Sequence, residues 1–165
     1  MIDKKQFFNY CTKAGCAWLK CYCTRQQGYN KFYSTRLDHN SIMRLYLYRD
    51  APDIPAREKQ KEFSILYGPL GIKKSDFGKA GHVTMKKVLG IVKGNSKAIF
   101  ASNDWWSVVN DFYCHPKIDL VKNPIVLREF DRGKLEIIDG NHRIIAKLLK
   151  EGFTFKCNAL VTAKA

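Results

Sequence analysis

A short apolar strand that turns at a glycine into an amphipathic helix constrains this chain more than any other feature. Residues 135–138 read Leu-Glu-Ile-Ile, a run that is typical of a strand. Gly140 permits a tight turn. Apolar residues then recur at helical spacing from Ile144 to Leu149, and Gly152 follows as a C-terminal stop. The sequence therefore predicts a strand, a turn and a helix in direct succession.

The first turn of the predicted helix has the composition of an anion site. Asn141, His142 and Arg143 lie where backbone N–H groups lack helical partners and the helix dipole is positive. We expect Arg143 to bind phosphate, because its planar fork is bidentate and a cation is otherwise unfavourable at a helix start. His142 is expected to be exposed, either as a ligand contact or as an ordinary polar residue. Asn141 is expected to hydrogen-bond either a phosphate or the backbone of the turn. Asp139 is expected to cap the helix, and it could also hold a metal or orient His142.

The same residues carry a resemblance to a known family. Asp139-Gly-Asn-His-Arg143, with Ala146 after two further residues, resembles the signature of the ParB/sulfiredoxin superfamily. The resemblance covers residues 118–162 and includes the turn 131–134 and a closing strand at 155–161. It implies a small mixed sheet with helices. It also implies that nucleotide phosphates bind at the turn and helix start, at Gly140, Asn141, His142 and Arg143.

The resemblance further implies a chemistry. A nucleoside triphosphate, ATP or CTP, is the expected ligand, with Mg²⁺ to offset its charge, and the reaction is phosphoryl transfer or triphosphate hydrolysis. Asp139 and His142 are the catalytic candidates, and Glu129 and Glu136 are further candidates for a base or metal ligand. Sulfiredoxin activity is not expected, because Asn141 stands where sulfiredoxins carry their nucleophilic cysteine.

The charge of the chain predicts a polyanionic partner. The net charge is +14, and residues 1–100 hold 19 Lys and Arg against 7 Asp and Glu, whereas residues 101–165 hold 10 against 8. A large and segregated positive charge favours DNA, with an acidic protein as the alternative partner. The lysines that we expect to contact DNA are Lys73, Lys74, Lys86 and Lys87.

The predicted class is α+β. A basic, mostly helical part at residues 1–100 precedes the ParB/sulfiredoxin-like part at residues 101–165, the two forming one compact unit. Residues 125–130 and 135–138 form a hairpin through Asp131–Lys134, on which Arg128 and Glu129 either face solvent or reach the phosphate site. Residues 41–48 are strand or helix. The predicted helices cover residues 3–23, 56–67, 84–92 and 102–112.

Composition adds further limits. A chain of 165 residues with 45% hydrophobic residues can bury a core as one domain. It has no run of 18 apolar residues and no signal-peptide pattern, so we expect a cytoplasmic protein without a membrane span. The early cysteines lack zinc-site spacing, so we expect small reduced thiols, with a metal site completed by His39 or His115 as the alternative. These cysteines are Cys11, Cys16, Cys21 and Cys23.

Together these features predict a nucleotide-binding protein that contacts DNA. Two alternatives remain. One is a DNA nuclease on the same fold, in which the His142–Arg143 site holds a DNA phosphate. The other is a module without enzymatic activity that binds DNA or an acidic protein.

Overall fold

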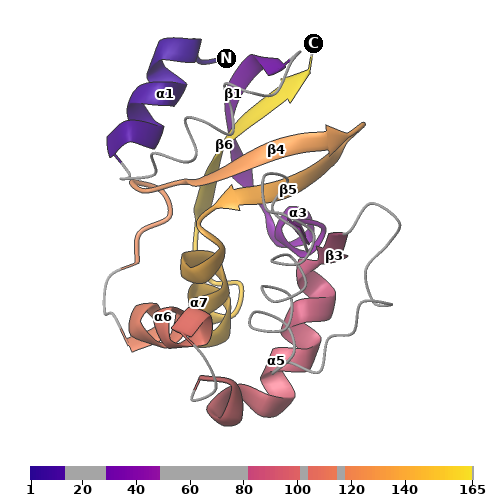
Figure 1. Cartoon of the computed structure of the whole chain (residues 1–165), viewed down its shortest axis with the longest axis vertical. Helices are drawn as coiled ribbons and strands as arrows, with labels where there is room; N and C mark the ends of the chain where they lie inside the picture. Colours follow the sequence, from indigo (N-terminus) through magenta and orange to yellow (C-terminus); the bar gives the residue numbers. More distant parts are fainter. Residues whose placement is uncertain (14–28, 49–81, 101–103, 115–117, 165) are drawn as a thin grey trace, which may run out of the picture.

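The computed structural model of the chain describes residues 1–13, 29–48, 82–100, 104–114 and 118–164 (Figure 1). The helix expected at 56–67 lies outside these residues, as do Lys73 and Lys74. The same holds for most of the early cysteines.

A six-stranded mixed sheet forms the centre of the described structure. Its strand order is β1-β6-β4-β5-β2-β3. Strand β6 is parallel to β4 and β2 is parallel to β5, whereas the other neighbours are antiparallel. The mixture of helices with this sheet confirms the α+β class. The strands are β1 (Tyr29–Leu37), β2 (Tyr46–Tyr48), β3 (His82–Thr84), β4 (Ile125–Asp131), β5 (Lys134–Asp139) and β6 (Cys157–Lys164).

The predicted hairpin is confirmed. Strands β4 and β5 pair antiparallel through the turn that ends at Lys134, and Asp131 pairs with Lys134 across it. Gly133 takes the left-handed conformation that closes this turn, with φ of +71°. The closing strand β6 then pairs with β4 in parallel register.

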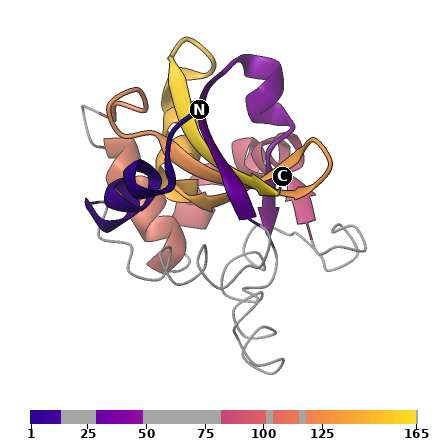
Figure 2. The ribbon, with the colours of Figure 1, turned by 90° about the horizontal axis from the view of Figure 1, so that it is seen from above.

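Residues 1–100 contribute half of this sheet. Strand β1 pairs with β6 along its length (Figure 2), and the short strands β2 and β3 extend the sheet beyond β5. The described N-terminal residues therefore supply three strands to the same sheet as residues 125–164, in addition to the helices α1, α3 and α5. Residues 41–48, for which the sequence left strand and helix open, contain both. A five-residue helix ends at Met43, and β2 begins at Tyr46.

Three longer helices, α5, α6 and α7, lie together on one side of the molecule, and α1 lies apart from them beside β1 (Figure 1). The helix predicted from residue 84 is present and runs on to Phe100, and the one predicted at 102–112 begins at Asp104. No helix in the described part of the chain is long and apolar enough to cross a membrane. The helices are α1 (Lys4–Lys13), α3 (His39–Met43), α5 (Met85–Phe100), α6 (Asp104–Cys114) and α7 (Asn141–Glu151).

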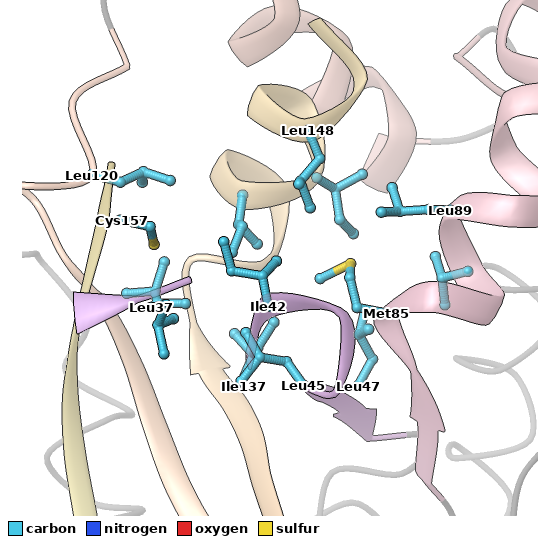
Figure 3. Packing of buried hydrophobic residues seen from close by; sticks show 14 of the residues in the cluster. Leu37, Ile42, Leu45, Leu47, Met85, Leu89, Leu120, Ile137, Leu148 and Cys157 are labelled. Atoms are coloured by element: carbon cyan, nitrogen blue, oxygen red, sulfur yellow. The ribbon is translucent and has the colours of Figure 1, made fainter. Parts of the chain in front are cut away.

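The main core lies between one face of the sheet and the helices α3, α5 and α7 (Figure 3). Leu148 of α7, Met85 of α5 and Ile137 of β5 belong to the same buried cluster. Each fully buried aliphatic side chain stabilises the fold by about 1.5–3 kcal/mol, so this packing fixes α7 against the sheet. Phe32 lies outside this cluster and contacts Phe7 of α1, with 5.1 Å between ring centroids.

Candidate functional site

The predicted strand, turn and helix are all present at residues 134–151. Strand β5 ends at Asp139, Gly140 has φ of +98°, and α7 begins at Asn141. Gly140 is buried against β4, and a Cβ on it would lie 2.6 Å from Cγ2 of Ile125. Only glycine fits this close approach in this conformation, so the residue sets the direction in which α7 leaves the sheet. We call residues 139–143 the Gly140 turn.

In the described part of the chain, no side chain of the N-cap residue caps the start of α7. The N-cap is Gly140, which offers no side chain, and the first turn contains no acidic residue. The short helix α3 shows the contrast, because Asp38 accepts a hydrogen bond from the Ser41 amide at 2.7 Å. Asp139, for which capping was one expected role, pairs with Arg143 at 3.5 Å. The N-cap residue of α7 therefore supplies no side-chain acceptor to the first turn.

Arg143 is half-buried rather than exposed. Its Nη1 donates to the Asn123 carbonyl at 2.6 Å, and its Nη2 lies 3.5 Å from the Pro124 carbonyl. The side chain is 17% exposed, which limits a ligand to one side of the guanidinium. The side chain turns back across the Gly140 turn, and its Nη2 lies 3.1 Å from where a Cβ of Gly140 would be.

His142 is also half-buried, against the expectation of exposure. Burial lowers the pKa of its imidazole below 6.5, and the nearby Asp139 carboxylate opposes that shift. At neutral pH the ring is therefore uncharged, so it can accept one hydrogen bond and donate another. Asn141 is half-buried as well, and its Oδ1 is shielded without a hydrogen-bond partner in the described part of the chain.

Lys147 follows Arg143 by one helical turn and has a similar role. Its Nζ donates to the Ile118 carbonyl at 2.6 Å and pairs with Glu151 at 3.0 Å. Arg143 and Lys147 therefore both hold the segment that leads into β4. Sequence reasoning missed this function, because hydrogen bonds to backbone carbonyls leave no pattern in the sequence.

The acidic candidate Glu136 lies away from the Gly140 turn. It is buried and ion-pairs with Arg128 of β4, and its Oε2 lies 2.6 Å from Nε2 of His82. Arg128 and Glu136 alternate along their strands with the core residues Leu127 and Ile137, so this buried charged group occupies the opposite face of the sheet. Arg128 is 8% exposed and does not face solvent.

Aromatic rings accompany the buried charged group. The His82 ring stacks on Phe130 with 3.7 Å between centroids, and Tyr46 meets both rings edge-on. Arg128 lies over the ring of Tyr29. Sequence reasoning missed the role of His82, since β3 is only three residues long and its partners are more than 30 residues away in the chain.

The remaining candidates are dispersed. Lys86 and Lys87 are exposed in the first turn of α5. Cys157 is buried, which raises the pKa of its thiol to about 11, whereas Cys114 is exposed. In the described ranges no group of three or more His, Cys, Asp or Glu residues is arranged to hold a metal ion.

Comparison with protein-family models, with curated protein sequences and with solved structures gave no match for this chain.

Proposed function

We propose that the Gly140 turn binds the phosphate groups of a nucleoside triphosphate, ATP or CTP, on a ParB/sulfiredoxin-like fold, and that the basic surface of the protein contacts DNA. The main support is the start of α7. There an uncapped helix N-terminus, a left-handed glycine and the side chains of His142 and Arg143 come together. Backbone amides at such a position, with the helix dipole, favour a phosphate group. The hairpin β4–β5 and the closing strand β6 agree with the fold that the motif implies.

The residues at the turn also suit phosphoryl transfer or hydrolysis of the triphosphate. His142 is neutral at pH 7 because burial lowers its pKa, so it can accept the proton of an attacking water or hydroxyl group. Asp139, 19% exposed, lies in the same turn and would hold Mg²⁺ beside the phosphates. Mg²⁺ would offset phosphate charge.

Calorimetric titration with ATP and CTP in the presence of Mg²⁺ tests the proposal. Arg143→Ala should weaken binding by about 1.5–3 kcal/mol, the range for a hydrogen bond to a charged group. Because Arg143 also holds the segment before β4, the matched control is Lys147→Met. That variant removes a contact to the same segment one helical turn from the site, and it should bind with unchanged affinity. An Arg143→Ala protein that binds as tightly as the native chain contradicts the proposal.

Turnover is measured in the same samples. Release of phosphate from ATP or CTP supports the enzymatic part of the proposal. Cleavage of DNA without triphosphate turnover would point instead to a nuclease. Binding of DNA with neither activity would point to a module without catalysis.

A further inference from the structure

The face of the sheet opposite the main core carries a cluster of aromatic and charged side chains, which we call the second-face cluster. Arg128 and Glu136 alternate along their strands with core residues and mark this face. Each of the six strands supplies a member, so the cluster crosses the whole sheet. Its members are Tyr29 of β1, Tyr46 of β2, His82 of β3, Arg128 and Phe130 of β4, Lys134 and Glu136 of β5, and Lys164 of β6.

A buried ionic centre holds the aromatic rings of the cluster. Glu136 pairs with Arg128 and with Nε2 of His82, and all three residues are at most 8% exposed. The His82 ring in turn stacks on Phe130, with 3.7 Å between centroids and 8° between planes. Tyr46 meets Phe130 edge-on, with 5.2 Å between centroids. Phe130 and Tyr46 are therefore fixed in orientation, and both are half-buried, so that part of each ring stays exposed.

The exposed charge of the cluster is positive. Lys164 is exposed, and its Nζ lies 5.4 Å from the centroid of the Tyr29 ring. The Lys134 side chain is 51% exposed and shares a face of β5 with Glu136, two residues further on. Its 3.2 Å contact with Asp131 is an exposed ion pair, which is weak and leaves the ammonium group able to meet another anion. Glu136, the acidic member of the cluster, is buried and already ion-paired.

Partly exposed rings beside exposed lysines suit an unpaired strand of nucleic acid. Every base has a π-face that can stack on an aromatic ring, and the sugar-phosphate backbone brings negative charge to the lysines. In a duplex the bases stack on each other, and a protein ring cannot reach their faces. An acidic peptide would complement the lysines, but its carboxylates are repelled by the negative faces of the rings. The combination therefore favours single-stranded nucleic acid.

We propose that the second-face cluster binds single-stranded nucleic acid, with bases stacked on Phe130 and Tyr46 and phosphates beside Lys134 and Lys164. This contact does not require a phosphate at the Gly140 turn. It uses aromatic rings in addition to charge, and so goes beyond the proposed contact of the basic surface with DNA.

Fluorescence anisotropy of a labelled oligothymidine, titrated with the full chain, tests the inference. Phe130→Leu should weaken single-strand affinity about 5- to 140-fold, the loss of one stacked base, because leucine keeps an apolar side chain against His82 but has no π-face. Phe130→Tyr keeps the ring and should bind like the native chain. The matched control is Phe153→Leu, which should also bind like the native chain. Phe153 is half-buried against the main core and stacks on His39 with 3.5 Å between centroids.

Two further measurements separate stacking from a change of fold. Stacking releases no counterions, so Phe130→Leu should leave the slope of log K against log salt unchanged, whereas Lys164→Gln should reduce it. Duplex DNA should bind Phe130→Leu as tightly as it binds the native chain. In the native chain, oligothymidine should shift the ring proton resonances of Phe130 and Tyr46 and leave those of Phe153 in place, which tests the contact without any substitution.

Three results would count against the inference, and each has its own meaning. If oligothymidine binds but neither the Phe130→Leu affinity nor the ring resonances respond, the inference is overturned and the proposed contact of the basic surface with DNA stands. If Phe130→Leu weakens duplex and single-strand binding equally, the ring supports the fold and not the ligand, which also overturns the inference. If neither form of DNA binds at low salt, the inference and the DNA part of the proposed function fail together, while the Gly140 turn is judged by calorimetry.

Discussion

Gly140 shows how one residue determines the geometry of the candidate site. The end of β5 enters α7 through its φ of +98°, and a Cβ at this position would lie only 2.6 Å from Ile125. Gly133 in the hairpin turn has a similar φ of +71°, but nothing lies within 4 Å of the position where its Cβ would be. Substitution of Gly133 therefore tests the energetic cost of the backbone conformation alone. Substitution of Gly140 tests that cost together with the cost of close contact.

Alanine at these two positions should have different effects. Gly133→Ala should lower the free energy of unfolding by about 1–2 kcal/mol, the cost of a left-handed conformation for a residue with a Cβ. Gly140→Ala should lower it by an additional ~1–3 kcal/mol, because the new methyl group would overpack against Ile125. Chemical denaturation measures both values, and equal losses would show that β4 moves aside without cost.

His142 gives a second prediction at the scale of single residues. Burial lowers its pKa below the unfolded value of 6.5, so the unfolded chain binds a proton that the folded chain does not. The contribution of His142 to stability is therefore present above pH 6.5 and is lost as the pH falls below that value. An NMR titration of the His142 ring should give a midpoint below 6.5, and added ATP should raise it. A midpoint of 6.5 or above in the free protein contradicts the burial of this ring.

At the scale of elements, the sheet depends on a charged group that spans three strands. His82 of β3, Arg128 of β4 and Glu136 of β5 are buried together, with the Glu136 carboxylate between the other two. Such a group costs desolvation energy when it forms, but removing one partner leaves a buried charge without its counter-ion.

Glu136→Gln should accordingly destabilise the protein by about 3–5 kcal/mol, the cost of breaking a buried pair. Glu129→Gln, on the neighbouring strand at a half-buried position, is the matched control and should cost much less. Thermal and chemical denaturation of the two variants decide the question. If the Glu136→Gln protein were as stable as the control, water or another group would have to replace the carboxylate as the hydrogen-bond partner of Arg128.

The elements differ in how far the sequence could predict them. The hairpin and α7 follow from local signals, since two short apolar runs, three glycines and a helical repeat all lie within residues 125–152. Strand β1 pairs with β6 more than 100 residues later, and β2 and β3 have three residues each, so no local periodicity marks them. The residues of the Gly140 turn were predictable, but the contact of Arg143 with Asn123 was not, because carbonyl acceptors carry no residue identity.

At the scale of the whole molecule, the net charge of +14 remains the main argument for a DNA partner. Lys86 and Lys87 are exposed at the start of α5, whose first turn has no acidic residue to offset them. Duplex DNA binding should therefore weaken steeply with salt, with a slope of about 0.9 in log K against log salt for each phosphate neutralised.

Replacing both Lys86 and Lys87 with Glu should reduce that slope. Lys150→Glu, an exposed lysine in the last turn of α7, serves as the matched control and should reduce the slope less. Fluorescence anisotropy across a salt series gives the slopes. If the protein does not bind DNA even at low salt, the DNA proposal fails and an acidic protein becomes the expected partner of the positive charge.

The central claim is that the start of α7 binds phosphate. The most direct test is a ¹⁵N NMR titration of the native chain with ATP and Mg²⁺, followed at the backbone amides of Asn141, His142 and Arg143. We predict that these three resonances shift together and saturate at the dissociation constant that calorimetry gives. Binding that shifts resonances elsewhere and leaves these three amides unchanged at saturation would contradict the claim.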